Sequence, residues 1–193
     1  MLVLVFGLVV FLGVHSVSIV APHWRGATIA RIGEKAWKGL YSLVAAVGLV
    51  LVVVGYGLAR KDPVVLYTSP AALRHLALLL MVPVFPLFLA TYFPGRLSSA
   101  AKHPTLVAVK LWAVAHLLAN GTLADVLLFG AFLIWAVADR IAVKRRPAAE
   151  RHDVPAAPAR PTNDVIAVVG GLLVYALLIA GAHRWLTGVS PVA

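Results

Sequence analysis

The stretch Lys102–Asp125, KHPTLVAVKLWAVAHLLANGTLAD, decides the fold. Its apolar segment, Pro104–Ala119, ends in a tight turn and is followed at once by another apolar segment. Three ionisable residues lie on or beside it: His103, Lys110 and His116. Ionisable groups in a membrane helix are costly, so they usually face a bundle interior or a cavity. We therefore expect the rest of the chain to form a membrane scaffold around this stretch.

The composition is that of an integral membrane protein. Of the 193 residues, 62% are hydrophobic and only 12% are charged, far less charge than soluble domains carry. The apolar residues form runs of about 20, the length that crosses a bilayer core about 30 Å thick. In lipid, a separate segment can form all its backbone hydrogen bonds only as a helix. We therefore expect an all-α polytopic bundle of six transmembrane helices. The expected spans are Leu2–Val20, Leu40–Leu58, Ala72–Tyr92, Pro104–Ala119, Leu123–Val143 and Val165–Leu186.

Lysine and arginine predict the topology, because they collect in cytoplasmic loops. Most lie in the first, third and fifth connections: Arg25, Arg31, Lys35, Lys38, Arg96, Lys102, Arg140, Lys144, Arg145, Arg146, Arg151 and Arg160. The other side carries Arg60, Lys61, Arg74 and Arg184. This pattern puts both termini outside. Within the first connection, Gly33–Lys38 suits either a short helix in the headgroup layer or charge that only fixes the topology.

The sequence divides into three parts. Residues 1–146 form the expected five-helix membrane core, residues 147–164 a Pro/Ala-rich cytoplasmic linker, and residues 165–193 an additional C-terminal transmembrane helix. Glycines of the last helix favour close contact with a neighbouring helix: Gly170, Gly171 and Gly181. In the third span, Pro83 and Pro86 predict a kink, which either opens a cavity or relieves packing.

The absence of cysteine excludes disulfides, thiolate zinc sites and iron–sulfur clusters. Any metal must therefore be held by histidine or carboxylate. The net charge of +10 follows from the loop charges of a membrane protein, and no stacked aromatics accompany the basic loops. We therefore expect membrane lipid as a partner and no nucleic acid, and the sequence does not indicate an oligomeric state.

Two histidines fall well inside expected spans. They are His15 and His116, whereas His75 and His103 lie nearer the membrane surfaces. Two neutral imidazoles on different transmembrane helices commonly hold a b-type haem; the alternative is an anion or lipid site with structural histidines. Lys110 lies on nearly the same helix face as His103, so the two could hold an anion, unless the lysine extends to the interface.

Two carboxylates have a candidate role beside these histidines. Counting from the turn between the fourth and fifth spans pairs His116 with Asp125, and His103 with Asp139. A carboxylate that accepts the second imidazole N–H would orient a metal-ligating histidine. Asp125 has an alternative role, because Thr122 and Asp125 have the spacing of a capping box. The alternative for Asp139 is a charge at a helix end.

Several segments together resemble a known family. They are LGVHS at 12–16, GEKAWKGLY at 33–41, GYG at 55–57, HP at 103–104 and LWAVAHLLANG at 111–121. Over residues 1–146 the chain resembles the NnrU family of bacterial membrane proteins. The resemblance implies a multi-pass protein of the bacterial inner membrane, with a role linked to denitrification and nitric oxide metabolism.

That family is similar to 15-cis-ζ-carotene isomerase, a haem b membrane enzyme. The resemblance implies haem b as cofactor with His15 and His116 as iron ligands, and it makes His103 a catalytic candidate, to which Lys110 is added. At a rise of 1.5 Å per residue, His15 lies about 20 Å and His116 about 5 Å below the outer ends of their spans. This difference in depth is larger than two ligands of one haem iron tolerate. By depth alone, His75 is therefore the alternative partner of His116.

Three functions follow as hypotheses. The first is a haem b-binding NnrU-type protein of nitric oxide metabolism. The second is a haem-dependent cis-trans isomerase of a carotenoid, in which an apolar small molecule is the substrate. The third is a membrane assembly or transport factor without a cofactor. Whether the protein is an enzyme is left open.

Overall fold

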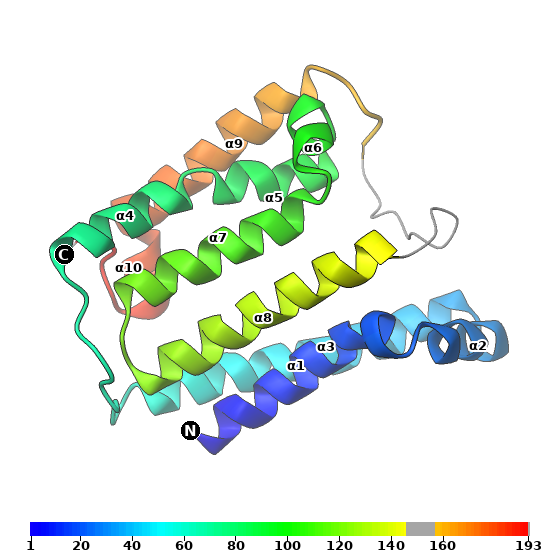
Figure 1. The fold of residues 1–193 in the computed structure, drawn as a ribbon, viewed down its shortest axis with the longest axis horizontal. Helices are drawn as coiled ribbons and strands as arrows, with labels where there is room; N and C mark the ends of the chain where they lie inside the picture. Colours follow the sequence, from blue (N-terminus) through cyan, green and yellow to red (C-terminus); the bar gives the residue numbers. More distant parts are fainter. Residues whose placement is uncertain (146–156, 193) are drawn as a thin grey trace. The chain divides into compact units, whose positions relative to one another are not determined.

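The computed structural model describes residues 1–145 and 157–192, which form helices joined by short connections (Figure 1). The helices are α1 Leu2–Val20, α2 Pro22–Ile32, α3 Glu34–Ala59, α4 Ala71–Met81, α5 Val84–Tyr92, α6 Arg96–Ala101, α7 Pro104–Ala119, α8 Leu123–Arg145, α9 Asn163–Leu177, the π-helical turn η2 Leu178–Ala182 and α10 His183–Thr187. The all-α prediction is confirmed. Arg146, the last residue of the predicted core, and much of the predicted linker, including Arg151, lie outside the described residues.

Five segments of the described chain are long and apolar enough to cross a membrane, as expected of a polytopic membrane protein. They are Leu2–Val20, Glu34–Ala59, Ala71–Tyr92, Leu123–Arg145 and Asn163–Thr187. Helix α7 is apolar, but its 16 residues rise only about 24 Å, less than a hydrocarbon core of about 30 Å. The sixth span therefore stays a prediction, as does the outside location of both termini.

The described residues form two compact units. The first unit comprises residues 1–68 and 120–145, and the second comprises residues 69–119 and the described part of 146–193. The core, linker and additional helix expected from the sequence stay predictions. The last long helix is nevertheless part of the second unit, where α9 packs against α5 (Figure 1).

In the first unit, glycines let the backbones of α1 and α3 approach closely. A Cβ atom added to Gly7 would lie 2.6 Å from the backbone nitrogen of Val52, and one added to Gly48 would lie 2.7 Å from that of Phe11. Small residues at such crossings are typical of packed membrane helices, in which van der Waals contact replaces the hydrophobic driving force. This seam holds the segment of α1 that carries His15 against α3.

The first connection is mostly helical, but the short helix lies elsewhere than predicted. It is α2, Pro22–Ile32, which has a proline in its first turn. At this position the backbone N–H would have no partner within the helix, so its absence from proline does not destabilise the helix. Gly33 separates it from α3 with a φ of 86°. The prediction of a separate helix at 33–38 is wrong, because Glu34 and Lys38 belong to the first turns of α3 and form an ion pair of 2.7 Å.

In the second unit, the predicted kink at the prolines is confirmed. Helix α4 ends at Met81 and α5 begins at Val84, because Pro83 lacks the N–H that would continue the helix. Pro86 lies in the first turn of α5, where a donor is not needed. The break changes the helix direction beside α7 (Figure 1).

The glycines of the last helix have different surroundings. A Cβ atom on Gly171 would meet the backbone nitrogen of Pro86, and one on Gly170 would lie 3.1 Å from Leu89 Cδ1. These two confirm the predicted close contact, which lets α9 pack against α5. The prediction is wrong for Gly181, which has no atom within 4 Å of its added Cβ and instead forms a kink with a φ of 153°.

Lys102 has a strained backbone between α6 and α7. Its φ of 60° and ψ of −37° are unfavourable for a residue with a Cβ atom. We expect Lys102→Gly to raise the free energy of unfolding by about 1 kcal/mol, measured by thermal unfolding in detergent. Lys102→Ala keeps the Cβ atom and should leave stability nearly unchanged. A lysine-to-glycine change that destabilises the protein would contradict this interpretation.

Candidate functional site

His15 lies in α1 and is held by its own helix. Its Nδ1 donates a hydrogen bond to the Phe11 carbonyl oxygen, one turn earlier, at 2.6 Å. A carbonyl oxygen can only accept, so Nδ1 carries the proton. Nε2 is then the ring nitrogen through which this imidazole can bind a metal.

Three aromatic rings surround His15 within the first unit. The ring centroids lie 4.3 Å from Phe11, 5.3 Å from Tyr41 and 5.9 Å from Trp135. The last two are edge-to-face contacts, which aromatic rings prefer. These rings come from α1, α3 and α8, so three helices together position His15. We call His15, Phe11, Tyr41 and Trp135 the His15 cluster.

Two polar features complete the His15 cluster. The Trp135 Nε1 atom is buried and has no hydrogen-bond partner within the described residues. The charges of Arg25 and Asp139 both act on the Tyr41 hydroxyl. Asp139 lies one turn after Trp135 on α8. This candidate carboxylate is therefore close to the His15 cluster.

His116 lies in α7 of the second unit and has the same local geometry as His15. Its Nδ1 donates to the Trp112 carbonyl oxygen at 2.8 Å, and its ring lies 5.3 Å from the Trp112 ring. The carbonyl oxygen can only accept, so the proton is again on Nδ1. Both histidines named by the resemblance are thus oriented by a backbone carbonyl oxygen one turn earlier.

An apolar pocket lies beside Trp112 in the second unit. It has a volume of about 210 Å³ and is lined by Val84, Phe85 and Phe88 of α5 and by Ala108, Val109 and Trp112 of α7. The α5 side of the lining starts directly after the break at Pro83. The pocket is open to the surface, so both interpretations of the kink, a cavity or packing relief, stay predictions. An apolar group is the ligand that such a lining suits.

Asp125 is buried, with 4% of its surface exposed, and has a structural role. Its Oδ2 accepts hydrogen bonds from the Thr122 backbone N–H at 2.9 Å and the Thr122 hydroxyl at 2.6 Å, and that hydroxyl accepts the Asp125 N–H at 3.3 Å. The capping box is confirmed. Its Oδ1 accepts a hydrogen bond from the Tyr56 hydroxyl at 2.5 Å.

The negative charge of Asp125 also affects Tyr67 in the nearby loop. The pKa of Tyr67 is raised, mainly by partial burial and to a smaller extent by the Asp125 charge.

The remaining candidates lie in the second unit. His103 is half-buried directly before α7, and Lys110 is half-buried two turns into it. His75 is exposed on α4. The pairs His116–Asp125 and His103–Asp139 each combine a residue of the second unit with one of the first, and both stay predictions.

His15 and His116 are the residues that would hold a haem, if the protein binds one. Among the described residues there is no group of three or more His, Asp or Glu side chains that could hold an ion. Haem supplies four nitrogen ligands itself and needs only one or two from the protein. Within the described residues, Trp135 also provides a buried N–H without a partner, beside the His15 ring.

Sequence reasoning missed the partners of these residues. Tyr41 and Tyr56 stand in the segments that carry the family resemblance, but no role was inferred for them. Trp135 could have been suggested by its position one turn before Asp139. Aromatic residues in an apolar helix are usually packing residues, so without the tertiary contacts nothing distinguished them.

The fold defines an all-α membrane protein with several apolar helices that are long enough to cross a bilayer, and two of its apolar helices carry a histidine oriented by its own backbone. The chain belongs to the NnrU protein family, which matches residues 3–191. The match extends past residue 146, where the resemblance in the sequence ended, and includes the last helix. No curated protein and no solved structure matches the chain.

Proposed function

We propose that this NnrU protein binds haem b through His15 and His116 and acts in nitric oxide metabolism. The observation that carries the proposal is the orientation of the two imidazoles, above all that of His15. Each is fixed through Nδ1 by the carbonyl oxygen one turn earlier, and in His15 this leaves Nε2 as the ring atom that can bind a metal. A second-shell hydrogen bond of this kind sets the tautomer and ring orientation of ligating histidines.

The surroundings of His15 support the same proposal. The rings of Phe11, Tyr41 and Trp135 pack around the imidazole and so hold it in one orientation, as the ligand of a cofactor requires. Haem iron supplies reversible electron transfer and binding of small gases such as nitric oxide. If both histidines occupy the iron, one of them has to dissociate before a gas can bind.

The visible spectrum tests this proposal. The protein should be produced in cells supplied with haem, purified in detergent, and measured oxidised and dithionite-reduced. We expect a Soret band and, on reduction, sharp α and β bands. His15→Ala and His116→Ala should each remove most of the bound haem or convert the spectrum to that of a five-coordinate iron. Nitric oxide added to the reduced protein should shift the Soret band.

A matched control is His183→Ala. His183 also donates from Nδ1 to a backbone carbonyl, that of Val189, at 2.7 Å, but it lies near the chain end in the short helix α10. Its replacement should leave the spectrum unchanged. His75→Ala tests the alternative ligand. A colourless wild-type protein would reject haem binding and favour a cofactor-free assembly or transport factor, whereas an unchanged His116→Ala spectrum would remove His116 from the site.

The apolar pocket supports a second candidate, a haem-dependent cis-trans isomerase of a carotenoid. Phe85, Phe88 and Trp112 provide flat aromatic faces against which a polyene can pack. Incubation of the haem-loaded protein with 15-cis-ζ-carotene, followed by chromatographic separation of the isomers, tests this activity. Conversion that requires the haem would favour the isomerase, and unchanged substrate would leave the nitric oxide function as the conclusion.

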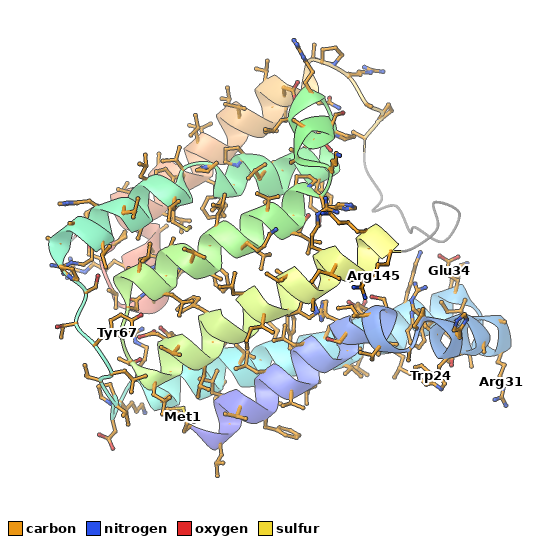
Figure 2. All side chains as sticks on the ribbon, viewed as in Figure 1. Met1, Trp24, Arg31, Glu34, Tyr67 and Arg145 are labelled. Atoms are coloured by element: carbon orange, nitrogen blue, oxygen red, sulfur yellow. The ribbon has the colours of Figure 1, made fainter. Side chains whose placement is uncertain are left out.

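The proposed arrangement in the bacterial inner membrane has six spans, with both termini outside. Figure 2 shows Trp24, Arg31 and Arg145 at one end of the first unit and Met1 and Tyr67 at the other. The basic side chains of the first connection therefore gather at the end opposite Met1. This distribution supports a cytoplasmic location for that end. Cysteine scanning at residues 1 and 31 with an impermeant thiol reagent would test the orientation.

A further inference from the structure

Trp135 carries an unused hydrogen-bond donor in the interior of the first unit. Its Nε1 atom is buried and unpaired within the described residues, and its ring meets the His15 ring edge-to-face, at 88°. Buried donors in native proteins nearly always have a partner, because leaving one unsatisfied costs free energy. Phenylalanine would provide the same packing without this cost. The indole N–H therefore indicates an acceptor that the chain itself does not supply.

The chemistry around Trp135 indicates which acceptor fits. Tyr41, whose ring contacts the same His15 ring as Trp135 does, provides a hydroxyl, and the positive charge of Arg25 acts on that hydroxyl. An indole N–H, a hydroxyl and a nearby cation suit a carboxylate. Haem b is apolar except for two propionate carboxylates, which need donors when they are taken out of water. The negative charge of Asp139 also acts on Tyr41 and disfavours a second carboxylate there, so the hydrogen bond from the indole has to offset part of this repulsion.

We infer that the Trp135 indole N–H donates a hydrogen bond to a propionate carboxylate of the haem that His15 binds. This inference rests on the proposed function and assigns Trp135 as a residue that positions the cofactor. It acts beside His15, on one edge of the haem, rather than on the iron. The bond gives the haem a preferred orientation around the His15 ligand.

The test compares two haems in two proteins. Wild type and Trp135→Phe, each depleted of haem in detergent, are titrated with haem b and with haem b dimethyl ester, whose carboxylates are no longer charged. Trp135→Phe should weaken haem b binding about tenfold, as expected for loss of a hydrogen bond to a charged group. With the ester the effect should fall to about threefold, since neutral hydrogen bonds are roughly half as strong.

A second measurement does not depend on affinity. In resonance Raman spectra, the propionate bending band reports hydrogen bonding to the carboxylates, and it should shift in Trp135→Phe. The control is Trp185→Phe, which removes an indole that is 84% exposed on α10 and should change neither binding nor the band. Thermal unfolding of each protein establishes that the variants are folded.

The outcomes separate this inference from the proposed function. A wild-type protein that does not bind haem overturns both. A wild type that binds haem, with a Trp135→Phe variant of equal affinity and an unshifted band, overturns the inference alone. Equal losses for haem b and its ester, without a band shift, also overturn it, because the indole would then contribute only packing.

Discussion

Gly55→Ala should lower the free energy of unfolding by about 3 kcal/mol, the upper part of the usual range for overpacking a core. A Cβ atom at Gly55 would overlap the backbone nitrogen of Leu4 and would lie 2.6 Å from its Cα and 2.7 Å from the Val3 carbonyl carbon. These are backbone atoms, so the strain cannot be relieved by a side-chain rotation. Helices α1 and α3 would have to separate, which would also move His15 away from Tyr41.

Gly57→Ala is the matched control, because Gly57 lies two residues later in the same helix and has no atom within 4 Å of an added Cβ. Alanine is the better helix former, so this change should be neutral or stabilise by up to about 1 kcal/mol. Both variants are measured by thermal or denaturant unfolding in the same detergent. If the two glycines respond alike, the close α1–α3 crossing is not as the structure shows it.

Asp125→Ala should destabilise the protein by about 3 kcal/mol, because it leaves buried polar groups without a partner. The substitution removes the acceptor of the Tyr56 hydroxyl and of both Thr122 donors. Tyr56→Phe removes one of these bonds and should cost about 1.5 kcal/mol. Because both changes act on the same bond, the double variant should be less destabilised than the sum of the single variants.

The control for the carboxylate is Asp62→Ala. Asp62 is exposed in the loop after α3, so its removal should change the unfolding free energy by less than about 0.5 kcal/mol. Unfolding curves of the four variants, together with wild type, give all the differences needed. Additive effects of the Tyr56 and Asp125 substitutions would show that the 2.5 Å hydrogen bond does not contribute to stability.

Several features were predictable from local sequence alone. Helices α1 and α7 have the predicted bounds, because an apolar run and the residues that end it are both local signals. The capping box of Thr122 and Asp125 was predictable for the same reason, since its partners are three residues apart. The break at Pro83 follows from the missing N–H of proline and does not depend on the rest of the fold.

The surroundings of the candidate site were not predictable in the same way. Tyr56 and Asp125 are 69 residues apart in the chain, and Trp135 and Tyr41 reach His15 from two other helices. In soluble proteins an apolar stripe identifies the buried face of a helix. In lipid the outer face is as apolar as the inner one, so the periodicity that would select the inward residues is absent.

The sequence by itself determined a membrane protein of apolar helices, the family to which it belongs and the histidines that merit attention. Only the tertiary structure decided which side chains enclose His15, which hydroxyl bonds Asp125 and which glycines permit contact between helices. The reason is physical. Helix formation depends on neighbours along the chain, whereas helix pairing in a membrane depends on the shape of side chains far apart in sequence, which hydropathy does not encode.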